Sequence, residues 1–318
     1  MSTFISVTPE NRPIAIAAAF TVVIVLIGTG YTLATQGTAP MLTMSYLLQQ
    51  LQIGSFLGLC AAGMMMVILL GHIDLSLPWT LTAAAMMATT VGGAWAIPAG
   101  LSVGLVVGVV NGLGVSYLRI PSMIFTLGVD SVLRGLMIAH TGGFAPQTEA
   151  TPLMRFLAAD KIAGLPAAVF VWGAVSVVIT IILTRTGFGK SIYATGAKES
   201  AAFLSGIRTH WVIIGAFVAS SLCASMAGIL LAGYSAKAYQ GMGAPFLLPA
   251  IAAVVLGGTH ILGGRGRFLG TLIGVVLIVF LNSVLSIMQM PEAFRQIIYG
   301  VVIVSMLLVY GRENKARH

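Results

Sequence analysis

Long apolar stretches separated by short polar ones dominate the pattern of this chain of 318 residues. A helix that crosses a hydrocarbon layer about 30 Å thick needs about 20 mostly apolar residues, whereas strands of a membrane barrel alternate at every second residue and stop after about ten. The stretches follow the helical pattern and predict about ten transmembrane helices. Their expected ranges are 13–34, 53–70, 76–92, 96–117, 121–140, 163–184, 210–233, 245–262, 268–288 and 294–311.

Composition agrees with this pattern. Hydrophobic residues make up 58% of the chain and charged residues 8%, and the mean hydropathy is +1.01. These values exclude an ordinary soluble protein and predict an all-α integral membrane protein with a single transmembrane domain over residues 1–318. The first stretch, 13–34, is longer than the apolar core of a secretory signal, so we expect it to be an uncleaved span.

The net charge of +8 does not indicate a nucleic-acid partner, because the basic residues sort by side of the membrane. With the N-terminus placed in the cytoplasm, ten crossings put eleven basic residues inside and four outside, and leave Arg134 within a span. The inner group is Arg12, Arg119, Arg185, Lys190, Lys198, Arg208, Arg265, Arg267, Arg312, Lys315 and Arg317, and the outer group is Arg155, Lys161, Lys237 and Arg295. Both termini are therefore expected in the cytoplasm.

A weak internal repeat relates two of the expected spans. The segment GVVNGLGVSYLRIP ends at Pro121 and GVVLIVFLNSVLSIMQMP ends at Pro291, and the offset from Asn111 to Asn282 is 171 residues. An odd number of spans separates the two copies, so they would point in opposite directions through the bilayer. The pattern indicates an inverted repeat, as found in many transporters, unless two glycine- and valine-rich helices resemble each other by chance.

Glycines recur every four residues at Gly100, Gly104, Gly108 and Gly112 and therefore share one helix face. Such a face allows another helix to approach closely. We expect close packing there, with a glycine face that lines a solute path as the alternative.

The inner loop, 185–209, reads RTGFGKSIYATGAKESAAFLSGIRT and predicts a short cytoplasmic helix. Glu199 would lie in its first turn and Gly206 would end it, leaving Phe203 and Leu204 exposed. An isolated helix this short is marginal in water, so something must pack against it. The partner is either the rest of this protein or a cytoplasmic subunit.

Charged and amide side chains at membrane depth are few, and each is costly unless it faces protein or water. They include Asp74, Asp130, Arg134, Asn111 and Asn282. Asp130 and Arg134 lie four residues apart on one predicted helix, a spacing that allows them to pair, and the alternative is a role in a solute path.

The segment LLGHIDLSLPW contains His72 and Asp74 between two apolar runs. Ser76 and Pro78 are compatible with the cap and first turn of the following helix. The alternative is a broken helix whose end lines a transport path.

No motif indicates an enzyme, and we predict no catalytic residue and no metal site. HExxH, GxSxG and a cysteine pair at zinc spacing are missing, and Cys60 and Cys223 lie inside apolar runs as small core residues. The P-loop pattern GxxxxGK[ST] is also missing. Energy for transport would therefore come from a partner or an ion gradient.

At four places the chain resembles the ribose and simple-sugar permeases of bacterial ABC importers, which are related to branched-chain amino-acid permeases. The matching stretches are GHIDLS at 71–76, NGLGVSYLRIP at 111–121, GFGKSIYATGAKESAAFLSGI at 187–207 and AIAAVVLGGTHILGGRG at 250–266. The resemblance implies a permease fold like that of the vitamin B12 importer. It also implies a multi-pass location in the bacterial plasma membrane and a second permease copy or sister permease. Two cytoplasmic ATPase subunits, which use ATP and Mg, and an extracytoplasmic solute-binding protein are implied as partners, while this chain binds no cofactor.

The expected function is then import of a small polar solute, most simply a monosaccharide, with an ion-coupled secondary transporter as the main alternative and a membrane enzyme as a remote one. The resemblance implies that the loop 185–209 couples to the ATPase. The expected coupling residues are Lys198, Glu199, Ala201, Ala202, Phe203, Leu204 and Gly206. The expected translocation path includes Asp74, Asn111, Asn282, Gly257, Gly258 and Thr259.

Overall fold

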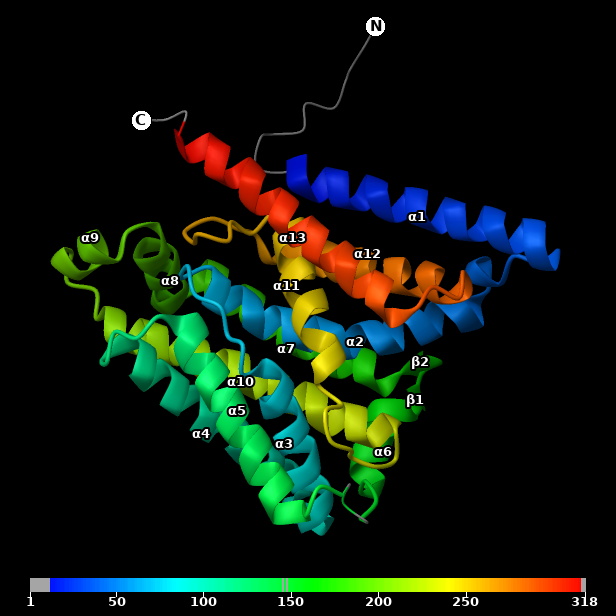
Figure 1. The fold of residues 1–318 in the computed structure, drawn as a ribbon, viewed down its shortest axis with the longest axis horizontal. Coiled ribbons are helices and arrows are strands. Elements are labelled where there is room, and N and C mark those ends of the chain that lie inside the picture. The colour runs from blue at the N-terminus through cyan, green and yellow to red at the C-terminus, as the bar shows by residue number, and fades with distance from the viewer. Residues whose placement is uncertain (1–11, 145, 147, 316–318) are drawn as a thin grey trace, which may run out of the picture.

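The computed structural model describes residues 12–144, 146 and 148–315, and these are almost entirely helical (Figure 1). The α-helices are α1 (Arg12–Gln36), α2 (Met44–Ile68), α3 (Leu77–Val91), α4 (Ala96–Ser116), α5 (Ser122–Thr141), α6 (Pro152–Ala159), α7 (Ala167–Arg185), α8 (Gly187–Ala197), α9 (Glu199–Leu204), α10 (Thr209–Tyr234), α11 (Leu247–Leu256), α12 (Phe268–Ile287) and α13 (Glu292–Lys315). Three 3₁₀ helices are η2 (Pro40–Leu42), η3 (Gly93–Trp95) and η4 (Ala244–Phe246). A small antiparallel hairpin joins β1 (Lys161–Ile162) to β2 (Leu165–Pro166), with Lys161 opposite Pro166 and Ile162 opposite Leu165. The prediction of an all-α protein is confirmed.

Seven helical segments within the described residues are long and apolar enough to cross a membrane, which supports an integral membrane protein. They are Pro13–Gln36, Met44–Ile68, Gly93–Ser116, Ser122–Thr141, Ala167–Arg185, Thr209–Tyr234 and Phe268–Ile287. Each coincides with one of the ten expected ranges. A further expected range, 294–311, lies within α13.

The start of α2 lies nine residues before the expected span, which began at residue 53. Polar residues Gln49, Gln50 and Gln52 interrupt the apolar pattern but do not break the helix, since glutamine is a good helix former. The side chain of Gln52 donates a 2.8 Å hydrogen bond to the carbonyl of Ala158 at the end of α6. A tertiary contact thus explains one polar residue that the pattern placed outside the span.

Two expected spans form shorter helices. The range 76–92 becomes the 15-residue α3, and the range 245–262 contains only the ten residues of α11. Gly257 ends α11, and Gly258, Gly263 and Gly264 then adopt positive φ angles that other residues rarely take. The apolar run therefore continues past the helix as irregular backbone, so 245–262 is not one continuous helix.

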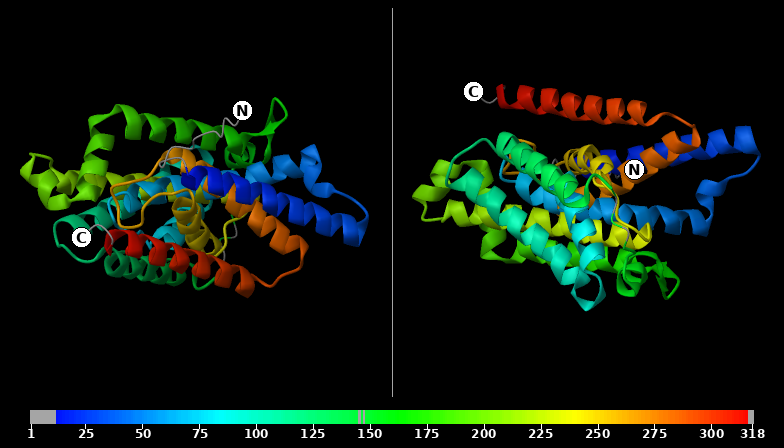
Figure 2. Two further views of the ribbon diagram at one scale, coloured as in Figure 1. Left: turned by 90° about the horizontal axis from the view of Figure 1, so that it is seen from above. Right: turned by 60° about the horizontal axis from the view of Figure 1, so that its bottom comes forward.

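The centre of the bundle is formed by α2 and α10, the two most buried of the seven long apolar segments, which pack against each other. They run in opposite directions (Figure 1): α2 begins beside α6 and ends beside α8, whereas α10 begins beside α8 and ends beside α6. By contrast α1 and α5 are the least buried of the seven. Figure 2 shows α1 and α13 at the outside of the bundle.

The glycine face on α4 packs against α10, which confirms close packing. A Cβ atom on Gly104 would lie 2.5 Å from the carbonyl oxygen of Ser221, and one on Gly108 would lie 2.5 Å from the Cα of Val218. These distances are too short for any side chain, so the two backbones touch. At Gly104 and Gly108 the glycine face is therefore covered by α10 and does not open to a solute path.

Packing repeats along the chain. Helix α2 packs against α11 and α12, and α10 packs against α3 and α4 in the corresponding way. The contacts of α3 with α4 and α5 likewise correspond to those of α11 with α12 and α13. Adding the offset of 171 to the bounds of α4, 96 and 116, gives 267 and 287, within one residue of α12. Helix α12 therefore follows α4 at the spacing that the sequence indicated, and helices α10–α13 repeat the packing of α2–α5.

Candidate functional site

The first candidate region is the break between α2 and α3, at residues 69–76. After α2 ends at Ile68, the chain turns at Gly71, whose φ is +78°, and enters α3 with Pro78 in its first turn. Side chains from α5 hold this backbone: the N–H of Ile73 donates to the Oγ of Ser122 at 3.3 Å, and the N–H of Leu75 donates to the Oγ1 of Thr126 at 2.9 Å. A helix starts at the expected place and the chain is broken before it, whereas a transport path along this break stays a prediction.

A buried polar cluster fills the inside of this break. The side chain of Asp74 is 0% exposed, and its Oδ1 accepts hydrogen bonds from the N–H of Ser76 at 3.0 Å and the Oγ of Ser76 at 2.6 Å. Its Oδ2 accepts from the Oγ of Ser220 on α10 at 3.0 Å. Asn111 on α4 donates through Nδ2 to the Oγ of Ser76 at 2.8 Å and to Asp74 at 3.4 Å. The carboxylate thus joins the break to α4 and α10.

Asp74 and Asn111 were expected to line a path, and the structure brings them together in the protein interior. Both side chains are fully buried, and the Oδ1 of Asn111 has no hydrogen-bond partner among the described residues. Their geometry is that of a brace between helices. Ser220, which completes the brace, carried no signal in the sequence because it lies 146 residues from Asp74.

The second candidate region is the irregular segment 257–267 between α11 and α12. Gly257 packs against the backbone of Gly270, and Gly258 packs against Pro13. Thr259 is fully buried, and its Oγ1 has no partner within the described part of the chain. The three residues expected to line a path are closely packed: Gly257 against α12, Gly258 against the start of α1 and Thr259 against Gly266. Their role in a path stays a prediction.

The two breaks meet each other and α8. The N–H of Gly264 donates a 2.8 Å hydrogen bond to the carbonyl oxygen of Leu69. A Cβ atom on Gly196, near the end of α8, would lie 1.8 Å from the same oxygen. Three segments that are distant in sequence therefore share one junction, which we name the Leu69 junction (Leu69, Gly196 and Gly264).

Helix α8 is held in place at its start and by a side chain in its second half. The Oγ1 of Thr186 caps its start by accepting from the N–H of Gly189 at 3.2 Å. The hydroxyl of Tyr193 donates to the carbonyl of Gly266 at 2.9 Å, and burial raises the pKa of Tyr193. This hydrogen bond ties α8 to the segment between α11 and α12.

Helix α9 confirms the short helix expected in the loop 185–209. Gly206, with φ of +85°, ends it: the N–H of Gly206 donates to the carbonyl of Phe203, and the N–H of Ile207 donates to the carbonyl of Ala202. This pair of bonds is the Schellman motif. Lys198 immediately precedes the helix, and Glu199 lies in its first turn.

Exposure divides the residues expected to couple α9 to a partner. Phe203 is 61% exposed and Leu204 is 85% exposed, whereas Ala202 is 4% exposed and packs inward. Lys198, Glu199 and Ala201 are also exposed. In Figure 1 α9 lies at the left edge of the molecule, and α13 ends toward the same side. An apolar pair thus projects from one end of the bundle.

Asn282 lies apart from the other residues expected on the path, near the opposite end of the molecule. It accepts a hydrogen bond from the hydroxyl of Tyr299 and borders a polar cavity of about 400 Å³. The cavity is lined by Tyr46, Gln49, Gln50, Ile53, Leu57, Pro245, Phe246, Pro249, Val279, Asn282, Ser283, Ser286 and Arg295. The polar residues at the start of α2 were a signal that the sequence analysis did not use.

Asp130 and Arg134 do not form the ion pair that their spacing allows. Among the described residues the salt bridges are Arg155 with Glu149 and Arg295 with Glu292. The Oδ1 of Asp130 instead accepts from the N–H of Trp79 at 3.2 Å, in the first turn of α3. A carboxylate at a helix start is favourable because free N–H groups point toward it.

The described residues contain no group of three or more His, Cys, Asp or Glu side chains that would hold a metal ion. Cys60 and Cys223 are both buried and free, in agreement with the expectation that they are small core residues.

Comparison with known proteins gives a consistent result. The family model described as "Branched-chain amino acid transport system / permease component" matches residues 46–307. The ribose import permease protein of Escherichia coli K12 is 34% identical over 280 residues, which cover 86% of this chain and 87% of that protein. The ribose import permease protein of Haemophilus influenzae is 32% identical over 256 residues, or 78% of this chain and 79% of the relative.

A third relative is the autoinducer 2 import system permease protein of Salmonella paratyphi B, 32% identical over 260 residues that cover 80% of this chain and 75% of the relative. No solved structure matches the chain. The family match spans the buried cluster, the Leu69 junction and α9. This chain therefore belongs to the family of permease components of branched-chain amino acid type transport systems.

Proposed function

We propose that this chain is the membrane-spanning permease subunit of an ATP-driven ABC importer that translocates a small polar solute, most simply a monosaccharide. Family membership and the ribose and autoinducer 2 import permeases among its relatives support this assignment. ATP and Mg are used by a partner ATPase, and this chain binds no cofactor. An extracytoplasmic binding protein delivers the solute.

The proposed topology has ten crossings, with α3, α11 and α13 added to the seven long apolar segments. The repeated packing of α2–α5 and α10–α13 and the opposite directions of α2 and α10 support an inverted repeat. Both termini and α9 then lie on the cytoplasmic side of a bacterial plasma membrane. A fold like that of the vitamin B12 importer is part of this proposal.

A second permease, either another copy or a sister chain, completes the path. Helix α5 supports this part of the proposal, because it is both the least hydrophobic and the least buried of the seven spans. A Cβ atom on Gly128 or Gly135 would meet nothing within 4 Å, so another helix has room to pack there. We propose that Asp74 and Asn111 brace the wall of this path, that Asn282 borders it, and that Gly257, Gly258 and Thr259 hold its inner end.

One observation carries the assignment of ATP coupling: α9, with its exposed apolar pair, is connected to both breaks through α8. Phe203 and Leu204 project from the end of the molecule, and α8, which precedes α9, packs on the Leu69 junction. Movement of α9 would therefore be transmitted to residues 69–76 and 257–267 through backbone contacts. Two cytoplasmic ATPase subunits docking on α9 of each permease would use this route.

The test is co-purification of the permease with its candidate ATPase, reading complex formation and stimulation of ATP hydrolysis. Leu204→Asp and Phe203→Asp replace exposed side chains, so both variants should fold, yet we expect loss of at least tenfold in both readouts. Leu153→Asp, an equally apolar exposed site on α6, is the matched control and should keep both. An intact, stimulated complex in both α9 variants would remove this helix from the mechanism.

The energy source distinguishes the proposed importer from an ion-coupled secondary transporter. In membrane vesicles, uptake by the proposed importer requires ATP and the partner ATPase and persists when the ion gradient is collapsed. Uptake that follows the gradient and continues without ATP would contradict the proposal.

A further inference from the structure

The polar cavity at the end of the molecule opposite α9 is not explained by the coupling route. It lies within one chain, between the first turns of α2, the segment 245–249, the last turns of α12 and the start of α13. A volume of about 400 Å³ lies within the range of small-molecule sites. Within its lining, Tyr46 and Ser283 bond each other and Asn282 accepts from Tyr299, which leaves the side chains of Gln49, Gln50 and Ser286 without a partner among the described residues.

We propose that this cavity is a binding site for a neutral polyhydroxylated solute, a monosaccharide or a compound of similar size and hydroxyl content. Its polar lining consists mainly of hydroxyl and amide groups, which both donate and accept hydrogen bonds. The hydroxyls belong to Tyr46, Ser283 and Ser286, and the amides to Gln49, Gln50 and Asn282. The solute class rests on the proposed function, whereas binding itself requires no ATP.

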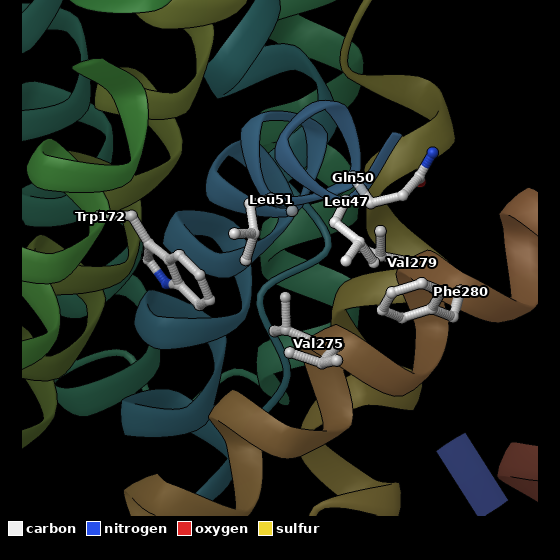
Figure 3. A pocket seen from close by; sticks show the side chains of 9 residues that line it. Leu47, Gln50, Leu51, Trp172, Val275, Val279 and Phe280 are labelled. Carbon is white, nitrogen blue, oxygen red and sulfur yellow. The ribbon is translucent and has the colours of Figure 1, made fainter. Parts of the chain in front are cut away.

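Gln50 brings to the cavity an amide that has no protein partner among the described residues. The residue is 8% exposed, and its amide is not among the fully buried polar groups, so it stays accessible from the cavity. Gln50 also borders an adjoining apolar groove, lined among others by Leu51, Trp172 and Phe280. Figure 3 shows that the amide of Gln50 points away from Leu51 and Trp172. A polar ligand in the neighbouring cavity would supply the partner that the amide lacks.

The charges of the site argue against an anion and against an amino acid. Among the described residues that line the cavity, Arg295 is the one that is charged, and Glu292 already pairs with it at 3.3 Å. Its NH2 nitrogen also donates to the carbonyl of Met290, while its Nε has no partner among the described residues. An amino acid would need an anionic group for its ammonium, and the described lining contains no acidic residue. The guanidinium therefore acts as a hydrogen-bond donor in a site with little net charge.

Apolar surface completes the match to a sugar. Apolar surface comes from Pro245, Phe246 and Pro249 in the segment 245–249, from Ile53 on α2 and from Val279 on α12. A sugar ring has an apolar face formed by its C–H groups and a polar edge formed by its hydroxyls. Sites for such ligands combine apolar and aromatic walls with a few placed polar groups.

The test is protection of an introduced thiol in the purified permease, reconstituted in lipid nanodiscs without ATPase or binding protein. Ser286 is exposed at the cavity, so Ser286→Cys should react with N-ethylmaleimide, while the native Cys60 and Cys223 are buried and unreactive. We expect saturating D-ribose or D-glucose to slow this labelling at least threefold and L-leucine to leave it unchanged. Met288→Cys, exposed on the same end of the chain but outside the cavity, is the matched control and should label at the same rate with each solute.

Absence of protection by either sugar, protection by leucine alone, or equal slowing of Met288→Cys would overturn the assignment. Gln49→Cys, a second exposed position at the cavity, gives the same readout if Ser286→Cys does not fold. Because no ATPase is present, these results do not depend on ATP coupling. Loss of the ATPase complex with sugar protection intact would overturn the proposed function and leave the site standing.

Discussion

The two breaks that meet at the Leu69 junction are held by different chemistry. Residues 69–76 are held by side chains: Asp74, Ser122 and Thr126 bind backbone N–H groups of the break or its neighbours. Residues 257–267 are held by backbone contact at glycines, with Gly257 against Gly270 and Gly264 against Ala197. The first break depends on hydrogen-bonding atoms that a substitution can remove, and the second depends on space that a substitution would fill.

This difference assigns distinct tasks to the breaks. The polar break is connected to α4, α5 and α10 by hydrogen bonds of Ser76, Leu75 and Asp74, so it ties these three helices together. The glycine break is connected to α8 and α12, so it joins the exposed end of the molecule to α12. Substitutions at the first break should therefore destabilise the protein by removing hydrogen bonds, and substitutions at the second break by adding atoms where there is no space.

The largest effect is expected for Asp74→Leu. This change leaves the N–H and hydroxyl of Ser76 and the hydroxyl of Ser220 without their acceptor in the protein interior, at a cost of about 3 kcal/mol or more. Asp74→Asn is the matched variant, since it keeps one acceptor oxygen and should lose much less. Thermal stability of the detergent-solubilised chain, followed by size-exclusion chromatography after heating, measures both. Equal stability of the two variants would contradict the brace.

A smaller but substantial effect is expected for Gly196→Ala. The added Cβ would lie 1.8 Å from the carbonyl oxygen of Leu69, so backbone must move, and overpacking of this kind costs about 1–3 kcal/mol. Gly187→Ala on the same helix is the control, because its Cβ meets nothing within 4 Å. The same thermal assay should rank Gly196→Ala well below Gly187→Ala. Equal melting would mean that the junction is loosely packed.

The smallest expected effect compares one threonine at each break, Thr126 at the first and Thr259 at the second. Thr126 accepts from Leu75 and donates to the carbonyl of Ser122, so Thr126→Val should cost about 1 kcal/mol. Thr259 is buried, and its hydroxyl has no partner among the described residues, so Thr259→Val should be neutral or slightly stabilising. A loss of stability in Thr259→Val as large as that in Thr126→Val would show that the second break also depends on side-chain hydrogen bonds.

Particular elements show how far the sequence could be interpreted. Helix α9 and its end at Gly206 were predicted because both depend on local signals, an acidic first turn and a terminal glycine. The glycine face of α4 was predicted to pack closely because its spacing alone places the glycines on one side. The early start of α2 was missed, since the contact of Gln52 with Ala158 spans 106 residues.

The site divides in the same way. Asp74, Asn111 and Asn282 stood out because polar groups in apolar spans are rare, yet nothing in the pattern distinguished the two that form a brace from the one that borders a cavity. The pairing possible for Asp130 and Arg134 was inferred from spacing on one helix. The structure instead turns Asp130 toward the start of α3, a neighbour that helix spacing does not reveal.

Hydrophobicity and glycine spacing act over a few turns of chain, so the membrane class, most of the spans and the exposed short helix could be inferred from residue order. The Leu69 junction, the partner of Asp74 on α10 and the polar cavity between α2, α12 and α13 each join segments more than a hundred residues apart. Which of these segments meet depends on how the buried faces of all the helices pack at once. That global fit, rather than any local propensity, places the polar groups of this permease.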